Sequence, residues 1–481
     1  MAKDEILEQV LEEFGKLAKI PRKSGHEEAV SNFLRDELTG LGLNVVQDKA
    51  FNLIADMPAA KGREQAPLTI LQSHMDMVCV AAEGVAYNPL TDGIQTVRTE
   101  EYLQAEGTSL GSDDGTGIAE ILYILKHLKE HGPIRVIFTV DEEQGMSGAI
   151  ALSEEYLKGA SFLINCDSEN WDVLTIGSAG SVNLDFSRRL KRVAPTAGRA
   201  FCLELGGLRG GHSGERIGDG RGNAIRTMAM LLKEISAKGM AELADFSGGT
   251  ARNAIPCTAK AIIATDLEES VIESCVEDTK RRFMAIYGAA EEGITITCKP
   301  HQHPMSVLAA DDKDRLLQLL TLLHTGVYTM SRVVPGLVET SANLGVIAMT
   351  EDRVEVQFFP RSAVDEQVDE FRLMAEDMAA LTGFDLQIGA KSPGWKERKD
   401  SKLAKLMSSI FEQQNGRPMT IEVIHAGLEC GWHFKKNPEL DIVSIGVTTL
   451  DIHSPKERLV LKTVRPQVEL IMETLRRIGE L

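Results

Sequence analysis

The sequence predicts an α/β fold with a mostly parallel sheet, divided along the chain by an inserted second α/β domain. Two observations carry this prediction. Near-continuous apolar runs alternate with amphipathic helical patterns in residues 1–185, which is typical of parallel strands covered on both faces. The pattern returns in residues 392–481, whereas residues 186–391 alternate strands and helices with few clustered carboxylates. We therefore expect 1–185 and 392–481 to form one domain and 186–391 another.

The elements of the first domain follow from the spacing of their apolar residues. Apolar residues three and four apart predict helices at 4–19, 25–41, 118–131, 400–415 and 463–479. Short apolar or β-rich runs predict strands at 43–48, 67–74, 133–143, 160–169, 419–425 and 440–447. Several of these strands end in acidic residues or histidine. In open parallel sheets, ligands bind beyond the carboxyl ends of the strands, so these ends are candidate binding positions.

The inserted domain reads as repeated β-α-β units, in an arrangement that allows two similar halves. Its predicted strands are 199–208, 259–265, 293–299, 338–348, 353–359 and 384–388. Its predicted helices are 222–235, 268–287, 314–324 and 365–383.

Composition excludes several classes of function. Of 481 residues, 71 are acidic and 52 basic, giving a net charge of −19 that opposes binding to nucleic acid. The seven cysteines are scattered and form no C-x-x-C motif, which favours reduced thiols over a disulfide framework. The charged N-terminus does not resemble a signal peptide, and no run approaches the ~20 apolar residues of a membrane span. We expect a soluble cytoplasmic protein with no membrane or nucleic-acid partner.

Five segments place acids or histidine where an apolar strand ends or a helix begins. They are "SHMDM", "GSDDGTG", "VDEEQG", "NCDSE" and "LDIHSPKE". Taken singly, a strand-end Asp is usually a helix cap or a solvated loop residue, and a lone histidine is usually inert. Together they would bring about four carboxylates and two imidazoles into one crevice, where their charge requires cations. Histidines among carboxylates favour zinc over calcium or magnesium.

These motifs, in this order with "GGHSG" and "HSPKERL", resemble the M20 family of dizinc peptidases. The resemblance covers essentially the whole chain and is greatest to the bacterial aminoacyl-histidine (Xaa-His) dipeptidases, on "TSANLGV" (340–346), "RSAVD" (361–365) and "HAGLECG" (425–431). It implies a dizinc peptidase domain split by an inserted lid domain. It also implies two Zn²⁺ per chain, with Co²⁺ or Mn²⁺ as alternatives.

The resemblance implies a role for each matching residue. The implied metal ligands are His74, Asp113, Glu143, Asp167 and His453, with Asp113 bridging the two ions. Asp76 would orient His74 from the same face of its strand, since residues two apart share a face. Glu142 would be the general base. Asp114 is expected to neighbour the site without coordinating a metal.

The resemblance also implies a substrate-binding set and a range of substrates. The set is His212, Asn253, Arg361, His425 and Gly427. The implied substrates are dipeptides with free termini, including Xaa-His and β-Ala-His, and other short peptides. The alternative activity is that of a related M20 amidohydrolase, either an N-acyl-amino-acid deacylase or a carboxypeptidase. A non-enzymatic binding module would lack the base or ligands, which are present here. The oligomeric state stays open between a homodimer and a monomer with a doubled lid.

Four histidines outside these motifs carry no such support. They are His127, His131, His301 and His303, and we expect all four at the surface.

Overall fold

The computed structural model describes residues 4–332 and 334–481, and the chain divides into two compact units. Unit 1 consists of the residues up to Gly177 together with Trp395–Val423 and Leu428–Leu481. Unit 2 consists of Ser178–Gly394 and Ile424–Gly427. Each unit has its own hydrophobic core.

The division of the chain differs from the predicted boundaries, because the insertion covers Ser178–Gly394 where 186–391 was predicted. Position 186, the predicted start of the insertion, lies inside strand β9 (Gly180–Arg189), which belongs to the sheet of unit 2. In β9, buried Val182, Leu184 and Phe186 alternate with more exposed polar residues. This alternation is the pattern of a strand with one buried face, and it was not recognised in the sequence. Residues 424–427 also join unit 2.

An eight-stranded sheet with a parallel centre forms the core of unit 1. In spatial order the strands are β1 (Asn44–Gln47), β2 (Leu53–Met57), β6 (Ile134–Thr139), β3 (Leu68–His74), β7 (Ala160–Asn165), β21 (Asp441–Ser444), β8 (Val173–Ser178) and β20 (Thr420–Ile424). The pairs β6–β3, β3–β7 and β7–β21 are parallel. Because β21 follows the insertion in the chain, both terminal parts build one sheet, and the predicted fold class is confirmed.

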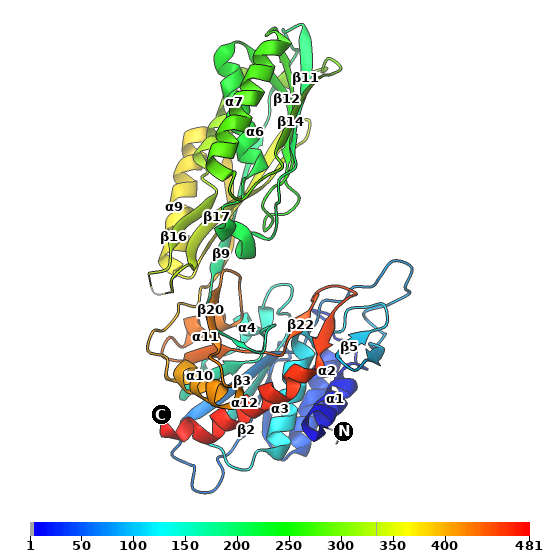
Figure 1. Cartoon of the computed structure of the whole chain (residues 1–481), viewed down its shortest axis with the longest axis vertical. Coiled ribbons are helices and arrows are strands. Elements are labelled where there is room, and N and C mark those ends of the chain that lie inside the picture. Colours follow the sequence, from blue (N-terminus) through cyan, green and yellow to red (C-terminus); the bar gives the residue numbers. More distant parts are fainter. Residues whose placement is uncertain (1–3, 333) are drawn as a thin grey trace. The chain divides into compact units, whose positions relative to one another are not determined.

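Both faces of this sheet are buried, as continuous apolar strands require. Along β3, Ile70 packs into one apolar cluster and Leu71 into another, since neighbouring residues point to opposite faces. Helices α1 (Glu5–Leu17), α3 (Ser112–His127), α10 (Lys402–Asn415) and α12 (Val464–Arg477) pack together (Figure 1). Helix α3 begins at Ser112, six residues before the predicted start, and therefore contains the "GSDDGTG" motif except for its first glycine, Gly111, which caps the helix.

The remaining elements of unit 1 include short pieces that were not predicted. Helix α2 (Glu28–Gly40) packs on β1 and β2, and α11 (Cys430–Lys436) packs on β21 and on α4 (Ser147–Ala151). A small antiparallel sheet contains β22 (Thr449–Leu450), β23 (Arg458–Val460), β5 (Tyr102–Ala105) and β4 (Thr96–Arg98). Its β22–β23 hairpin carries His453.

Unit 2 contains an antiparallel sheet. The order is β14 (Thr295–Pro300), β11 (Arg199–Gly206), β13 (Ala259–Thr265), β12 (Ala241–Gly248), β17 (Val338–Met349), β18 (Arg353–Ser362), β9 and β19 (Asp385–Ser392). Off this path, β16 (Gly326–Met330) pairs with β17, and β10 (Arg192–Val193) pairs with β15 (Val307–Leu308).

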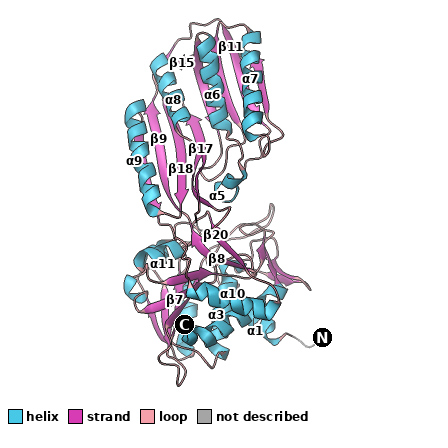
Figure 2. Ribbon diagram, turned by 60° about the vertical axis from the view of Figure 1, so that its left-hand side comes forward, coloured by secondary structure: helices cyan, strands magenta, loops and turns pink. Residues whose placement is uncertain are grey.

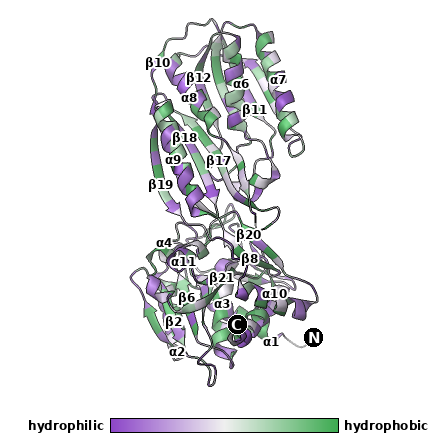
Figure 3. Ribbon diagram, turned by 90° about the vertical axis from the view of Figure 1, so that its left-hand side faces the viewer, coloured by the Kyte–Doolittle hydropathy of each residue, from purple (hydrophilic) through white to green (hydrophobic). Residues whose placement is uncertain are grey.

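Four helices cover one face of the unit 2 sheet. They are α6 (Ala224–Lys238), α7 (Glu269–Tyr287), α8 (Ala310–Leu322) and α9 (Asp365–Thr382) (Figure 2). These helices carry both hydrophobic and hydrophilic residues, as a half-buried helix requires (Figure 3). Helix α6 joins β11 to β12, and both strands pair antiparallel with β13, which lies between them. The predicted β-α-β units are therefore split units, in which a third strand separates the two parallel strands.

No helix in the described part of the chain is both long enough and apolar enough to cross a membrane.

The separate cores predict that unit 2 folds by itself. Every buried residue of its main apolar cluster lies between Val182 and Phe384. We expect the fragment 178–394 to unfold in one cooperative thermal transition, followed by circular dichroism. Phe246→Ala, at a fully buried site, should lower its stability by about 3–5 kcal/mol. Leu381→Ala, at a site 60% exposed, should change it by no more than about 0.5 kcal/mol. A broad, non-cooperative transition would contradict this prediction.

Candidate metal centre

His74 and Asp76 lie at the carboxyl end of β3, where the strand leaves the centre of the sheet. His74 is 1% exposed and Asp76 is fully buried. Nδ1 of His74 lies 3.3 Å from Oδ1 of Asp76, without the alignment of a full hydrogen bond. The carboxylate of Asp76 therefore attracts the Nδ1 side of the imidazole. The other ring nitrogen, Nε2, faces the remaining acidic residues.

Asp113 lies between two histidines that are far apart in the sequence. Its Oδ1 is 3.0 Å from Nε2 of His74, and its Oδ2 is 3.2 Å from Nε2 of His453. Asp167 Oδ1 is 3.4 Å from the same nitrogen of His74, and Glu143 Oε1 is 3.0 Å from that of His453. The five predicted ligands thus form two groups, which share the carboxylate of Asp113.

These separations fit a pair of tetrahedral metal sites. Ligand atoms about 2.0–2.1 Å from a tetrahedral zinc lie about 3.3 Å from one another. The four contacts through the two Nε2 atoms span 3.0 to 3.4 Å. The donor set of two imidazoles and three carboxylates is one that zinc accepts. The residues present therefore fit a dinuclear centre.

In three groups of the described residues, one ligand atom from each residue lies within 4.8 Å of those of the other two. They are His74–Glu142–Glu143, His74–Asp114–Asp167 and Asp113–Glu143–His453. The second group contains Asp114, which the sequence predicted not to coordinate a metal. Its Oδ2 accepts hydrogen bonds from the hydroxyl of Ser73 and from the amide of His74, 3.3 Å away. Because this oxygen is already occupied, we favour Asp113 as the ligand beside His74.

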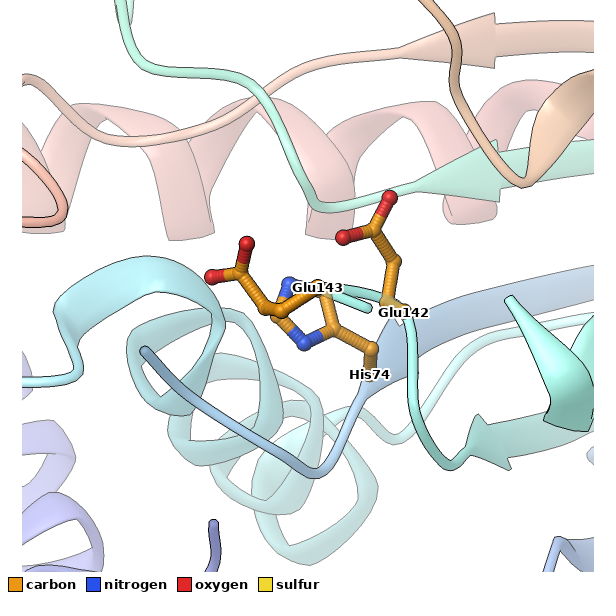
Figure 4. Close-up of side chains that lie close together, drawn as sticks. All are labelled: His74, Glu142 and Glu143. Carbon is orange, nitrogen blue, oxygen red and sulfur yellow. The ribbon is translucent and has the colours of Figure 1, made fainter. Parts of the chain in front are cut away.

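Glu142 and Glu143 lie in the loop that follows β6. In Figure 4 their side chains leave the loop in different directions, with that of Glu143 beside the imidazole of His74. The amides of Glu142 and Glu143 both donate to the carboxylate of Asp76, over 3.0 and 3.2 Å. Asp76 therefore holds this loop as well as His74.

Burial, hydrogen bonds and neighbouring charges shift the pKa of several groups in the centre. Burial raises the pKa of Asp167 to about 8, and Asp113 acts in the same direction. Burial and the neighbouring Asp167 raise the pKa of Glu142 well above its usual range. Hydrogen bonds to Asp113 and Glu143 raise the pKa of His453 to about 11. The centre thus favours extra positive charge, which divalent cations supply when they replace protons.

Several buried residues that support the centre were not singled out from the sequence. Glu457 accepts hydrogen bonds from the amides of Leu110, Gly111 and Ser112, over 2.8, 3.0 and 2.7 Å, and so joins the His453 segment to the start of α3. Glu429 is fully buried, and burial raises its pKa to about 7. Both residues lie inside quoted motifs, "HSPKERL" and "HAGLECG", but nothing in the local sequence separates them from surface acids.

One of the four histidines expected at the surface is buried. His127, His301 and His303 are exposed. The expectation for His131 was wrong, because its side chain is 4% exposed and its Nδ1 lies 2.8 Å from the carbonyl oxygen of Gly132.

The predicted substrate-binding residues all belong to unit 2. The loops of His212 and Asn253 are joined, because the amide of Ser213 donates to the Asn253 carbonyl over 2.7 Å and His212 forms a β-bridge with Ala254. Asn343 of β17 donates to the carbonyls on both sides of Asn253, over 2.9 and 2.8 Å. The backbone beside Asn253 is therefore fixed, while the residue itself stays exposed.

Arg361 is a buried cation with no acidic partner among the described residues. It is 6% exposed, it lies over the ring of Phe359, and its Nε has no hydrogen-bond acceptor. Burial and the charge of Arg361 lower the pKa of His425 to about 3 and also lower the pKa of His212. Nε2 of His425 lies 2.7 Å from the hydroxyl of Ser341. This surrounding suits an anion, because a buried guanidinium without a counter-charge is unfavourable.

Known proteins resemble this chain over nearly its whole length. Cytosol non-specific dipeptidase of Escherichia coli (strain K12) is 34% identical over 468 residues, 97% of this chain and 96% of that protein. The crystal structure of aminoacylhistidine dipeptidase from Vibrio alginolyticus matches with a TM-score of 0.90 and 34% identity, covering 98% of this chain and 96% of that one. Aminopeptidase PepT from Bacillus cereus ATCC 10987 shares the fold, with a TM-score of 0.58 and 17% identity over 98% of each chain. The profile of peptidase family M20/M25/M40 matches residues 70–477, and the chain therefore belongs to this family of peptidases.

Proposed function

We propose that this protein is a cytoplasmic dizinc dipeptidase that hydrolyses dipeptides with free termini, including Xaa-His and β-Ala-His, and other short peptides. The observation that carries the proposal is the carboxylate of Asp113, whose two oxygens face the Nε2 atoms of His74 and His453 at 3.0 and 3.2 Å. The names of the relatives from Escherichia coli and Vibrio alginolyticus, both dipeptidases, support the proposed substrate class.

Each proposed ligand follows from the contacts of the two histidines. One zinc would be held by His74, Asp113 and Asp167. The other would be held by Asp113, Glu143 and His453. Asp76 would orient His74. Co²⁺ or Mn²⁺ would fit the same donors.

The proposed mechanism assigns proton transfer to Glu142. The zinc ions, when bound, would polarise the peptide carbonyl and lower the pKa of the attacking water. Glu142 would accept a proton from this water and pass it to the leaving amine, so that its charge is restored at each turnover. Burial and the neighbouring Asp167 raise the pKa of Glu142, which suits a carboxylate that must hold a proton before passing it on.

The proposed carboxylate site lies around Arg361 in unit 2. Arg361 would bind the free carboxylate of the substrate. The other proposed substrate-binding residues are His212, Asn253, His425 and Gly427. A guanidinium binds a carboxylate through two parallel hydrogen bonds. Unit 2 would serve its own chain in a monomer, or a partner chain in a homodimer, and light scattering on the purified protein measures which of these two forms is present.

The second candidate function is that of an M20 deacylase or carboxypeptidase. An unpaired Arg361 would also suit the free carboxylate of an N-acyl-amino acid or a longer peptide. A panel of Xaa-His dipeptides, N-acetyl-amino acids and longer peptides separates the two candidates, and we expect the dipeptides to have the highest kcat/KM.

Removal of metal should abolish activity. After chelation we expect no dipeptide hydrolysis, with recovery on addition of zinc, cobalt or manganese, because the acidic cluster requires cations. Elemental analysis should give two metal ions per chain in the native protein and about one in His453→Ala. His127→Ala, an exposed histidine outside the site, is the control and should retain both. Full activity in a demonstrably metal-free sample would contradict the proposal.

Substitution should distinguish the base from the adjacent ligand. Glu142→Ala should keep two metals and lower kcat by about 10²–10⁴-fold, the usual contribution of general acid–base catalysis. Glu143→Ala should lose a metal as well, because its Oε1 is 3.0 Å from Nε2 of His453. Metal content and kcat are measured on the same samples. The roles are reversed if Glu142→Ala loses a metal and Glu143→Ala does not.

Loss of Arg361 should affect only substrates with a free carboxylate. Arg361→Met keeps the bulk of the side chain and should lower kcat/KM for a dipeptide by about 10²-fold or more. For the same dipeptide with a C-terminal amide, variant and native protein should differ little. Arg353→Met, on the same strand but exposed, should resemble the native protein on both substrates. An equal loss on both substrates would exclude Arg361 from carboxylate binding.

A further inference from the structure

The segment Arg22–Glu27, "RKSGHE", contacts three separate loops of the candidate metal centre. It lies between α1 and α2, and its Ser24 and Gly25, with Pro21 just before it, give it the composition of an ordinary connecting loop. Arg22, Ser24 and Glu27 are nevertheless buried, with exposures of 1%, 5% and 5%. None of the roles proposed above uses them.

Arg22 joins the end of β3 to the start of α3. Its Nη1 donates to the carbonyls of Met75 and Asp76 over 3.1 and 2.9 Å, and its Nη2 donates to the carbonyl of Gly111. The amide of Met77 in turn donates to the Arg22 carbonyl over 3.1 Å. One guanidinium therefore fixes the backbone beside His74 and the backbone before Asp113.

Two glycines of the "GSDDGTG" motif leave room for this guanidinium. A Cβ atom at Gly111 would lie 2.4 Å from Nη2 of Arg22, and one at Gly115 would lie 2.5 Å from it. Gly111 also has a φ of +68°, which favours glycine. Gly111 and Gly115 thus lie where a larger residue would collide with the guanidinium of Arg22.

Ser24 and Glu27 reach the loop that carries Glu142 and Glu143. The hydroxyl of Ser24 donates to Asp76 Oδ2 over 2.8 Å, and Asp76 accepts the amides of both glutamates. Oε1 of Glu27 accepts the amide of Asp141 over 2.9 Å and that of Gly25 over the same distance. The amides of three consecutive residues, 141–143, are thus held by two buried carboxylates.

This loop needs such support because its backbone is strained. Asp141 and Met146 have φ angles of +58° and +54°, which are unfavourable for residues other than glycine. The carboxylate of Glu27 is directed at Asp141 and makes no side-chain cap on its own helix, α2. A strained loop persists only where its surroundings hold it in place.

We propose that Arg22–Glu27 is a positioning brace for the metal centre, in which Glu27 holds the 141–146 loop so that Glu142 points to its reaction partner. Glu27 is a positioning residue that acts through the amide of Asp141. The proposal rests on the assignment of Glu142 as base and Glu143 as ligand. The brace holds the backbone of the loop, which the metal ligands alone do not do.

The test compares Glu27→Ala, Glu27→Gln and a matched control, Glu28→Ala, in the full chain as purified. Glu28 is the exposed neighbour at the start of α2. Hydrogen exchange should be about 10-fold faster over residues 140–146 in Glu27→Ala, because a hydrogen bond that closes the loop is lost. Exchange over 118–125, inside α3, should not change. Glu27→Gln, whose amide oxygen still accepts, should recover most of the protection.

Kinetics supply the second measurement. Glu27→Ala should lower kcat for a dipeptide by about 10²-fold, with KM within about threefold and two metals retained, because a small displacement of the base is costly. The proposal would be overturned if Glu27→Ala had the same hydrogen exchange and the same kcat as the control Glu28→Ala. A uniform rise in exchange that includes 118–125 would also overturn it, since Glu27 would then only stabilise the fold. If native protein hydrolyses no dipeptide but the local exchange rises, the brace stands and the proposed function fails.

Discussion

The repulsion among carboxylates gathered at one edge of a sheet is the constraint on which the rest of unit 1 depends. Asp113, Glu143 and Asp167 lie together around two imidazoles, and Asp76 and Glu142 lie beside them. In a medium of low dielectric constant such a cluster is unfavourable unless positive charge and hydrogen-bond donors compensate it. The histidines, the buried guanidinium of Arg22 and the backbone amides aimed at Asp76 and Glu457 supply part of this compensation. The proposed metal ions would supply the rest.

A layer of polar side chains below the ligands joins neighbouring strands of the unit 1 sheet through hydrogen bonds. Asn165 of β7 donates to Gln72 of β3 over 2.6 Å. Gln72 and Thr139 both donate to Glu429 Oε2 over 2.7 Å. These residues cross three neighbouring strands, and strand pairing keeps them in register. The layer therefore fixes the relative height of β3, which ends at His74, and of β7, which ends two residues before Asp167. This is a condition for both side chains to reach one site.

The sequence predicted those features that local patterns determine. Apolar runs located the central strands of unit 1, and the family motifs identified His74, Asp113 and His453, which the fold brings together. Strand β9 was missed because it alternates buried apolar residues with more exposed polar ones, unlike the continuous apolar runs that located the central strands of unit 1. Arg22 and Glu27 were missed for a different reason, because they have hydrogen-bond partners 54 and 114 residues away in the sequence. Nothing in the local sequence distinguishes a buried charged residue from an exposed one. Long-range pairing of polar groups leaves no period in the sequence.

The position of His453 has a consequence for biosynthesis. The histidine lies on a hairpin that follows the whole of unit 2 in the chain, whereas His74, Asp113 and Asp167 precede it. A ribosome therefore releases four of the five proposed ligands, Glu143 included, and then more than two hundred residues of unit 2, before the last ligand leaves the exit tunnel. During that interval the nascent polypeptide presents a cluster of acids with only one of its two imidazoles. Completion of the proposed dinuclear site would accordingly be a late event in translation, and the loading of both proposed metal ions would belong to the finished chain.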